Sequence, residues 1–415
     1  MRAVPLPSRG ERLGEGLRAT TLLCVLLLAA CGGTQAAPVA SSSAAQASTA
    51  AAKPASSAAA TPAASAAASG AVSSDWNALV EAAKKEGSVS VWGTPGTPYR
   101  QVLVTEFEKA YPGIKVDGVF VPPAERTSRL NLERQAGKYT VDIWASPGAQ
   151  VTDFKKVGII HDLQPELVLP EVKDTSGWFQ NHLWWVDKDP PLTWNLPIGS
   201  VIPMVFVNTK LVDPSTFKSY KDLLDPKWQG KMASTDIRNP GPGFAPARML
   251  FKSPDLGADY MKQLFSPSRV KLSTDQKQLI DWLGQGTYPI GLFIDPGEVT
   301  VAIKQGLPLA MVPPDQFKEG AAIGPNNGGV TIIDKAPHPN AARVYLNWML
   351  SKEGQTVWQR EVGDNSLRTD ISKDGVNPLF VPKQGVNYTN VGTEDIALAY
   401  NQPLFKQTID AAQGA

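Results

Sequence analysis

The sequence predicts an α/β fold, with a largely parallel sheet covered by helices and the folded residues divided between more than one lobe. Strand-like segments alternate with segments of helical spacing along the first part of the folded region, and such alternation is typical of parallel sheets. The chain has 415 residues, of which 42% are hydrophobic and 19% are charged. That is enough to bury a core in each of two lobes of ordinary size.

The folded part is expected to begin near Ser74, after a stretch without hydrophobic periodicity. Apolar residues at helical spacing predict helices, and short β-rich runs bounded by Gly and Pro predict strands. The expected elements, in order, are a helix over 76–86, a strand over 88–92, a helix over 99–110, a strand over 114–121, a helix over 124–135 and a strand over 141–144.

The N-terminus has the pattern of a bacterial secretory leader. Four arginines precede an apolar run from Leu22 to Ala30, which is too short to span a bilayer stably. The run ends in Leu-Ala-Ala-Cys-Gly, which resembles a lipobox and implies cleavage before Cys31 and acylation of its thiol. Residues 1–30 are therefore expected to be a lipoprotein signal peptide, with the mature protein outside the cytoplasm and anchored to the cell membrane. The alternative is a buried helix that happens to end in cysteine.

Residues 31–74 are expected to be the lipidated cysteine followed by a disordered tether. From Thr34 the segment consists almost entirely of Ala, Ser, Thr, Pro and Gln, so it has too little apolar surface to fold. The two cysteines, Cys24 and Cys31, precede the folded part, which therefore cannot form a disulfide or a cysteine metal site. The net charge of +1 gives no electrostatic reason to expect a nucleic-acid partner.

Two loops after predicted strands are candidate ligand contacts, because ligands of parallel sheets bind beyond the carboxyl ends of the strands. In the first loop, Gly93 permits close backbone approach, and Thr94 and Thr97 supply hydroxyls. In the second, Ser146 could cap the next helix and Gly148 follows it. Each loop could equally be a turn and a helix cap without ligand contact.

Three segments resemble one protein family. They are FEKAYPGIKV at 107–116, YKDLLDPKWQGK at 220–231, and APHPNAA at 336–342 running on to SKEGQ at 351–355. In this order they are similar to the extracellular solute-binding proteins of ABC importers with the type 2 periplasmic-binding fold, particularly the branch that includes ferric-iron binders. The resemblance covers about residues 75–370.

The resemblance implies two discontinuous lobes joined by crossing strands, with a ligand in the cleft between them and closure by hinge motion. The crossings are expected near 198–208 and 308–314. The first lobe would then comprise 75–203 and 312–415, and the second lobe 204–311. The implied partners are a small polar ligand, with anions among the candidates, and an ABC permease with its ATPase. The protein is expected to be a monomer that needs no cofactor.

The second lobe contributes its own candidate loops. In relatives the loop after residue 235 opens into the cleft, so Arg238 and Asn239 could bind a carboxylate or phosphate beside Asp236 and Gly241. The alternative is a surface loop in which Asp236 and Arg238 pair with each other. Asp295 has the position of a helix N-cap, with Pro296 and Glu298 completing a capping box. Its loop is also expected to border the cleft.

Two further features have two interpretations. Trp194 and Asn195 could stack on and bind a ligand in the cleft, but core packing is the favoured explanation of the indole-rich segment. The glycine-rich turn at 324–329 could reach the hinge. The sequence also departs from the ferric-iron binders. They carry adjacent tyrosines after the strand that matches 290–294, whereas this region has no tyrosine pair and Tyr288 stands alone before the strand. The three histidines share no ligand spacing. No metal site is therefore expected.

An enzyme on the same fold is a competing class. The folded part lacks a cysteine nucleophile, and the chain has no G-x-S-x-G elbow, H-E-x-x-H helix or P-loop, so no catalytic residue is expected. A ligand-sensing lipoprotein that serves no permease has the same sequence features and stays open. The ligand itself is also open among sugars, amines, organic acids, phosphonates and metal complexes.

Overall fold

The computed structural model describes residues 76–396 and 403–414. The predicted signal peptide, Cys31 and the tether lie outside the described residues, so their interpretation stays a prediction. Within the described ranges, no helix is both long enough and apolar enough to cross a membrane.

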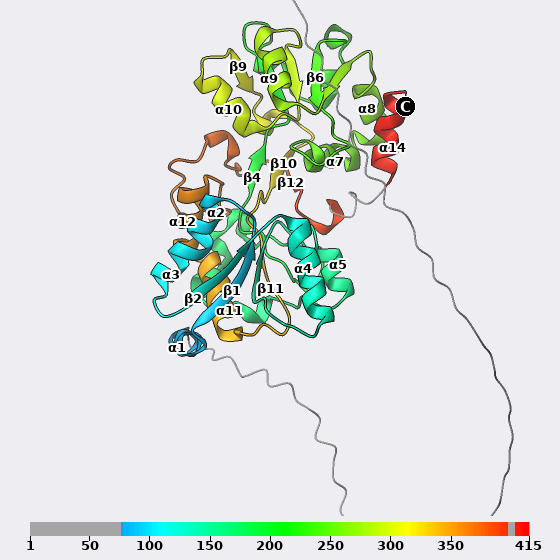
Figure 1. The fold of residues 1–415 in the computed structure, drawn as a ribbon. Helices are drawn as coiled ribbons and strands as arrows, with labels where there is room; N and C mark the ends of the chain where they lie inside the picture. The colour runs from blue at the N-terminus through cyan, green and yellow to red at the C-terminus, as the bar shows by residue number, and fades with distance from the viewer. Residues whose placement is uncertain (1–75, 397–402, 415) are drawn as a thin grey trace, which may run out of the picture. The chain divides into compact units, whose positions relative to one another are not determined.

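The first lobe is built on a four-stranded sheet in the order β11-β3-β1-β2 (Figure 1). Strand β1 pairs in parallel with both β2 and β3, and β11 pairs antiparallel with β3. The strands are β1 (Ser88–Gly93), β2 (Lys115–Phe120), β3 (Ile143–Ala145) and β11 (Val330–Ile332). The three strands expected from the alternation are therefore present and parallel, as predicted.

Helices of the first lobe come from both ends of its discontinuous sequence. They are α1 (Trp76–Glu86), α2 (Thr97–Arg100), α3 (Phe107–Ala110), α4 (Pro123–Gln135), α5 (Val151–Lys156), α6 (Pro170–Lys173), α11 (Pro339–Leu350) and α12 (Lys352–Val362). A π-helical stretch, Gln101–Glu106, joins α2 to α3. The helix expected over 99–110 thus forms with a widened turn in its middle.

The second lobe has a five-stranded sheet in the order β7-β6-β8-β5-β9. Strand β6 is parallel to β7 and β8, whereas β5 runs antiparallel to β8 and β9. The strands are β5 (Val205–Asn208), β6 (Met232–Thr235), β7 (Val270–Ser273), β8 (Ile290–Leu292) and β9 (Leu309–Met311). The helices are α7 (Phe244–Lys252), α8 (Gly257–Leu264), α9 (Gln276–Gln285), α10 (Pro296–Lys304) and α14 (Pro403–Ala412).

Three short strands connect the lobes, and Figure 1 shows them between the two larger sheets. Strand β10 (Ala321–Gly324) pairs antiparallel with β4 (Ser200–Ile202) and parallel with β12 (Tyr388–Asn390). The first crossing agrees with the expected 198–208. The second was expected at 308–314, which is wrong, because that run forms β9 at the edge of the second-lobe sheet and the chain returns through β10.

The C-terminal helix also departs from the expected lobe assignment. Residues 312–415 were all expected in the first lobe, but α14 packs on α8 of the second. Phe405 is buried in the core of that lobe, with its ring 5.3 Å from Phe251. The chain therefore returns to the second lobe after β12, where the apolar face of α14 is covered.

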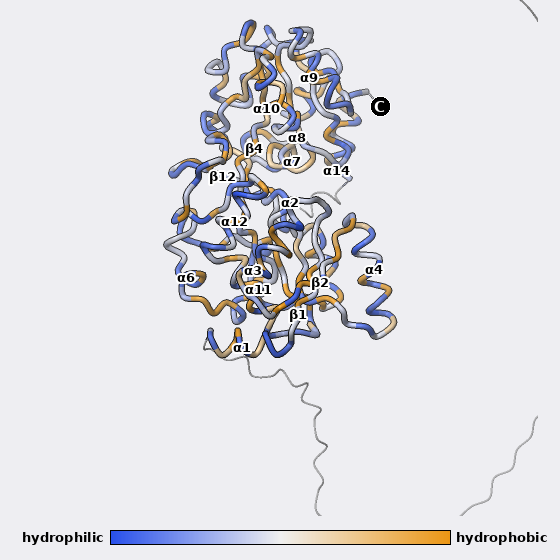
Figure 2. The backbone as a smooth tube through the Cα atoms, turned by 60° about the vertical axis from the view of Figure 1, so that its left-hand side comes forward, coloured by the Kyte–Doolittle hydropathy of each residue, from blue (hydrophilic) through white to orange (hydrophobic). Residues whose placement is uncertain are grey.

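Each lobe has its own hydrophobic core. One cluster of buried residues joins the first-lobe sheet to α1, α11 and α12, and includes Trp144 and Trp348. Separate clusters fill the second lobe on the two sides of its sheet. Figure 2 shows the apolar segments inside each lobe and hydrophilic segments along their outer loops. The cores are separate, and within the described residues the short strands β4, β10 and β12 lie where the chain passes between the lobes, an arrangement that suits hinge motion.

Candidate functional site

A cleft of about 870 Å³ lies between the lobes at the crossing strands. Its lining comes from the first lobe, the second lobe and strand β4. The residues are Tyr99, Ser200, Val201, Ile202, Gly241, Pro242, Asp295, Pro296, Gly297, Asn326, Asn327, Val362, Gly363, Asp364 and Phe380. A smaller hollow of about 220 Å³ shares Ile202, Pro242 and Asn326 with this cleft. The volume is in the range of small-molecule sites in proteins.

Tyr99 and Asn327 form the first polar group of the first-lobe wall. The amide Nδ2 of Asn327 donates a hydrogen bond of 2.7 Å to the Tyr99 hydroxyl, and the Thr94 hydroxyl lies 3.5 Å from Asn327 Oδ1. Because the Tyr99 oxygen accepts from Asn327, its own proton is available to an acceptor in the cleft. Burial raises the pKa of Tyr99, and the nearby carboxylate of Asp364 acts in the same direction.

Asn326 and Asp364 form the second polar group. Asn326 adopts a left-handed backbone conformation with φ of 48°, and its Nδ2 donates to Asp364 Oδ1 at 2.5 Å and lies 3.4 Å from the Ser200 hydroxyl. The other carboxylate oxygen of Asp364 lies 3.4 Å from the indole nitrogen of Trp358. Burial raises the pKa of Asp364 against the effect of these two donors, and no cation contributes to it.

The segment that carries Asp364 is tied to the chain just before β4. Asn365 donates from its side chain to the Gly199 carbonyl at 2.8 Å, and its backbone N–H donates to the Ser200 hydroxyl at 3.1 Å. Leu367 N–H donates to the Pro197 carbonyl at 2.8 Å. The cleft carboxylate therefore sits on a segment whose backbone is fixed to the hinge.

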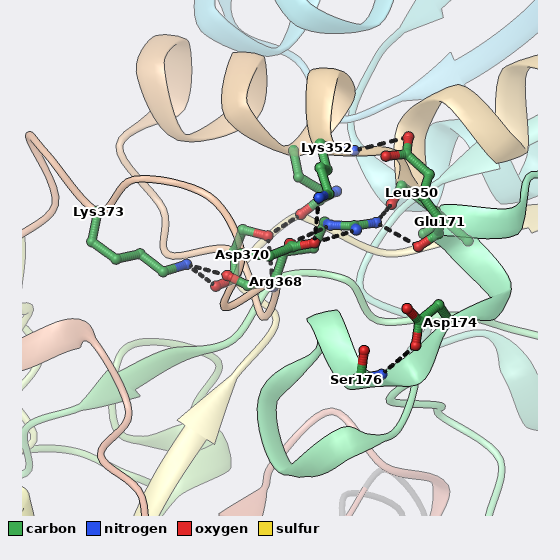
Figure 3. Close-up of polar contacts among 10 residues, drawn as sticks. Glu171, Asp174, Ser176, Leu350, Lys352, Arg368, Asp370 and Lys373 are labelled. Atoms are coloured by element: carbon green, nitrogen blue, oxygen red, sulfur yellow. Dashed lines mark hydrogen bonds and ion pairs between the residues drawn. The ribbon is translucent and has the colours of Figure 1, made fainter.

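A buried arginine anchors the same segment from its other end. The Arg368 guanidinium donates two hydrogen bonds, of 2.8 and 2.9 Å, to the Asp370 carboxylate (Figure 3). Its Nη1 also donates to the carbonyls of Leu350 and Glu171. Lys352 lies 3.1 Å from Asp370. Lys373 donates to the carbonyls of residues 366 and 368, and Figure 3 shows it approaching from the side opposite Glu171. These bonds fix the path of residues 364–370.

The ion pair of Asp370 predicts a pH dependence of stability. The hydrogen bonds from Arg368 lower the pKa of Asp370 from 3.8 to about 2. A lowered folded-state pKa gives stability that is present above the unfolded-state pKa and is lost as the pH falls toward 2. After discounting for solvent screening, we expect this loss to be about 1 kcal/mol. Denaturant unfolding at pH 5 and at pH 3 measures how much the free energy of unfolding falls between the two. This fall should be smaller in Asp370→Asn than in wild type, and an equal fall in both proteins would contradict the expectation.

On the second-lobe wall, Asp295 is the N-cap of α10. Its Oδ1 accepts hydrogen bonds from Gly297 N–H at 2.8 Å and Glu298 N–H at 3.1 Å, with Pro296 at the first helical position. The predicted cap is therefore confirmed. The second hydrogen bond of the predicted capping box, from the Asp295 N–H to the Glu298 side chain, is not formed. The Asp295 N–H donates instead to Gln276 Oε1 at 3.0 Å. Oδ1 accepts both capping hydrogen bonds, and Oδ2 takes no part in them.

The comparisons with known proteins agree with this geometry. The pattern of the family described as "Bacterial extracellular solute-binding protein" matches residues 90–356, well over half of the chain. The chain belongs to this family. A curated but uncharacterized protein of Haemophilus influenzae is 23% identical to this solute-binding protein over 175 residues, which are 40% of this chain and 47% of that protein. The chain thus spans about half the length of the curated relative it matches.

Solved structures share the two-lobed fold with this solute-binding protein. The Trichodesmium protein IdiA (FutA) in complex with iron and citrate is 16% identical with a TM-score of 0.56, over 79% of this chain and 99% of that chain. Apo ferric ion-binding protein A of Pasteurella haemolytica is 14% identical with a TM-score of 0.57, over 79% and 98%. AfuA of Actinobacillus pleuropneumoniae, with fructose-6-phosphate bound, is 18% identical with a TM-score of 0.52, over 78% and 98%. The predicted family and fold are confirmed.

Arg238 of this solute-binding protein is held by two carboxylates and is not among the cleft residues. It bonds to Asp236 at 2.7 and 2.8 Å and to Asp410 of α14 at 2.8 Å. This pairing with Asp236 is the alternative considered for the loop. Asn239 is exposed outside the cleft lining, whereas Gly241 lines the cleft together with Asp295. Ligand contact by each of these residues stays a prediction.

The first-lobe loops lie beside the cleft, but most of their predicted residues do not line it. Gly93 is packed so that a Cβ atom would come within 2.8 Å of Phe120, and Gly148, at φ of 87°, faces Val186. Thr94 reaches the cleft only through Asn327, and Thr97 begins α2 on the surface.

Ser146 was expected to cap the next helix, which is wrong. Gln150 occupies the N-cap position of α5, and Ser146 is buried with its backbone N–H bonded to the Gly329 carbonyl at 2.9 Å. The neighbouring Pro147 and Ala149 line the smaller hollow instead. Sequence spacing placed this loop near the cleft but did not fix which of its residues face it.

Trp194 and Asn195 are completely buried and are absent from the cleft lining. The Trp194 indole donates to the Ser146 carbonyl at 2.9 Å, and its ring lies 6.0 Å from Phe154. Asn195 pairs through its backbone with Val330, while its side-chain amide has no hydrogen-bond partner. The structure places both residues in the core, which was the alternative considered.

Sequence reasoning missed several cleft residues as candidates, among them Tyr99, Asn326, Asn327 and Asp364. The glycine-rich turn at 324–329 gave a weak signal for two of them, because it was expected to reach the hinge. Tyr99 was assigned to the apolar face of a helix. Asp364 stands in no motif, and only the approach of distant segments brings it to the cleft.

Proposed function

We propose that this protein is the extracytoplasmic solute-capturing component of an ABC importer, anchored to the cell membrane through a lipid on Cys31. It takes a small polar ligand into the interlobe cleft and performs no chemistry on it. Ligand binding selects a closed arrangement of the lobes, which a permease with its ATPase then recognises. The protein acts as a monomer without a cofactor.

The observation that carries the proposal is the composition of the cleft. The hydroxyls, amides and carboxylates converging there come from both lobes and the hinge. A ligand that contacts Asn326 on one side and Asp295 on the other would therefore favour closure through direct bonds to each lobe. Family membership supports the same role.

Thermal unfolding of the full-length protein in detergent, measured against a broad ligand panel, tests solute capture. The panel contains sugars, amines, carboxylates, phosphonates and ferric complexes. At least one class is expected to raise the Tm, since a ligand at about 100 times its Kd stabilises the folded state by about 2.7 kcal/mol. The absence of a shift with every class would overturn the proposal.

Replacing Cys31 with alanine tests the anchor separately. We expect Cys31→Ala to lose the acyl modification and to leave the membrane fraction, because the thiol is the proposed site of acylation. Membrane fractionation and mass spectrometry of the N-terminal peptide measure both effects. Replacing Cys24, the other cysteine, is the matched control and should change neither. Continued lipid attachment in Cys31→Ala would contradict the proposed lipobox.

A further inference from the structure

We propose that the cleft takes a small organic cation, a protonated amine or a quaternary ammonium, and that Asp364 is the carboxylate that recognises its charge. This inference rests on the proposed function, since it names the class of solute that the interlobe cleft would capture.

The charged side chains that line the cleft are all acidic. They are Asp295 on the second lobe and Asp364 on the first, and neither arginine, lysine nor histidine lines the main cleft or the smaller hollow. A carboxylate held in a partly buried site without a cationic partner retains a strong preference for a positive ligand. Asp364 has this character, because its two hydrogen-bond donors are the neutral amide of Asn326 and the neutral indole of Trp358.

The basic side chains that flank Asp364 in the sequence bind other groups. Arg360 is bound to Glu106 at 3.0 Å and to Glu361 at 2.7 Å. Lys373 donates its protons to Gln359 and to two backbone carbonyls. On the other lobe, Arg238 is held by Asp236 and Asp410. These contacts leave the cleft carboxylates without an internal counter-ion from these groups.

Arg126 lies deeper in the first lobe. It is completely buried, and its Nη1 donates to the carbonyls of Trp92 and Ala145 at the carboxyl ends of β1 and β3. It contributes no atom to the lining of the cleft. Its Nε and Nη2 have no hydrogen-bond partner among the described residues, but the guanidinium is buried behind the cleft lining.

The helix ends around the cleft favour the same sign of charge. The C-terminal end of α12, an eleven-residue helix, contributes Val362 and Gly363 to the lining, and the helix dipole places partial negative charge there. The N-terminus of α10 also faces the cleft, but the Asp295 carboxylate occupies its first N–H groups. In α7 the first N–H, from Phe244, donates to the Gly241 carbonyl and Pro246 has no N–H to offer. An anion would therefore find few free N–H groups at the N-termini of α7 and α10.

Aromatic and hydrogen-bonding groups complete the site for an ammonium compound. Tyr99 and Phe380 line the cleft, and the ring centroid of Trp358 lies 5.9 Å from that of Tyr99. Aromatic faces attract ammonium groups through their quadrupoles. The free proton of Tyr99 could bind a hydroxyl or carbonyl oxygen of the same ligand. Among the described residues, no group of three or more His, Cys, Asp or Glu side chains is arranged to hold a metal ion, which favours an organic cation over a metal.

Isothermal titration calorimetry of the full-length protein tests the inference with charge-matched probes. The cations are choline, putrescine and spermidine; the neutral probes are 3,3-dimethyl-1-butanol, which is the uncharged isostere of choline, and glucose; the anions are citrate and glucose 6-phosphate. We expect at least one cation to bind, and the neutral probes and anions to bind at least about tenfold more weakly, because a hydrogen bond to a charged group is stronger than one between neutral groups. Selective binding of a neutral or anionic probe would overturn the inference while leaving solute capture intact.

Substitutions at the cleft separate charge recognition from folding. Asp364→Asn keeps an acceptor for Asn326 but removes the charge, so it should weaken binding of the cation about tenfold or more at an unchanged Tm. Asp364→Glu keeps the negative charge and should therefore lose less affinity for the cation than Asp364→Asn. Asp153→Asn is the matched control, since its carboxylate is 81% exposed on α5, outside the cleft. Equal affinities in Asp364→Asn and wild type would overturn the role of Asp364, whereas no binding by any solute class would instead overturn solute capture itself.

Discussion

Replacing Asp142 with alanine is expected to lower the free energy of unfolding by about 3–5 kcal/mol. Its carboxylate is completely buried and accepts hydrogen bonds from Ser90 N–H at 2.7 Å, His338 N–H at 2.8 Å and His338 Nδ1 at 2.8 Å. These donors belong to β1 and to the N-cap residue of α11. The substitution would leave two backbone N–H groups without acceptors inside the first lobe, and each costs about 1–3 kcal/mol.

Urea unfolding of Asp142→Ala, followed by tryptophan fluorescence, measures this loss as a lower midpoint. Asp153→Ala is the matched control, because its side chain is 81% exposed and its nearest basic partner, Lys156, is 3.7 Å away. It should change stability by less than about 0.5 kcal/mol. If the two variants unfolded at the same denaturant concentration, the carboxylate of Asp142 would not be the tie between β1 and α11.

The sequence predicted those helices and strands that depend on a local pattern of residues. The strands and helices over 76–145 follow from apolar spacing and from Gly and Pro at their ends, and they form at the expected places. The second crossing was misplaced because 308–314 and 321–324 are both short apolar runs. Only strand pairing distinguishes them: β9 pairs with β5 inside the second lobe, and β10 pairs with β4 at the hinge.

Residues whose surroundings depend on distant contacts could not be placed. Arg238 resembled an anion ligand within its own loop, but its second carboxylate, Asp410, is 172 residues away on a helix whose docking had no sequence signal. Tyr99 faces the cleft through a bond to Asn327 that spans 228 residues. Asp295 was easier, since one local pattern predicted its cap and the strand before it predicted its place at the cleft.

The anchoring of Asp364 predicts that a substitution outside the cleft should disturb both stability and binding. Arg368→Met removes a side chain that is 1% exposed and that satisfies the Asp370 carboxylate and two backbone carbonyls, those of Leu350 and Glu171. Because Asp370 itself is partly exposed, we expect the loss to come mainly from the carbonyls left without a donor, at about 1–3 kcal/mol. The ion pair contributes less, because Lys352 stays within 3.1 Å of Asp370 and retains part of its charge balance.

Hydrogen exchange distinguishes this local effect from general loss of stability. In Arg368→Met, the amides of Asn365 and Leu367 should exchange faster relative to those of β6, because residues 364–368 lose their anchor while the second-lobe sheet is untouched. Arg368→Lys keeps the charge but cannot reproduce the two-pronged contact with Asp370, so its exchange rates should fall between those of Arg368→Met and wild type. Affinity for the cleft ligand should fall in the same order, since Asp364 would be held less firmly. Uniform acceleration across both lobes would instead mean that Arg368 stabilises the fold without positioning the cleft carboxylate.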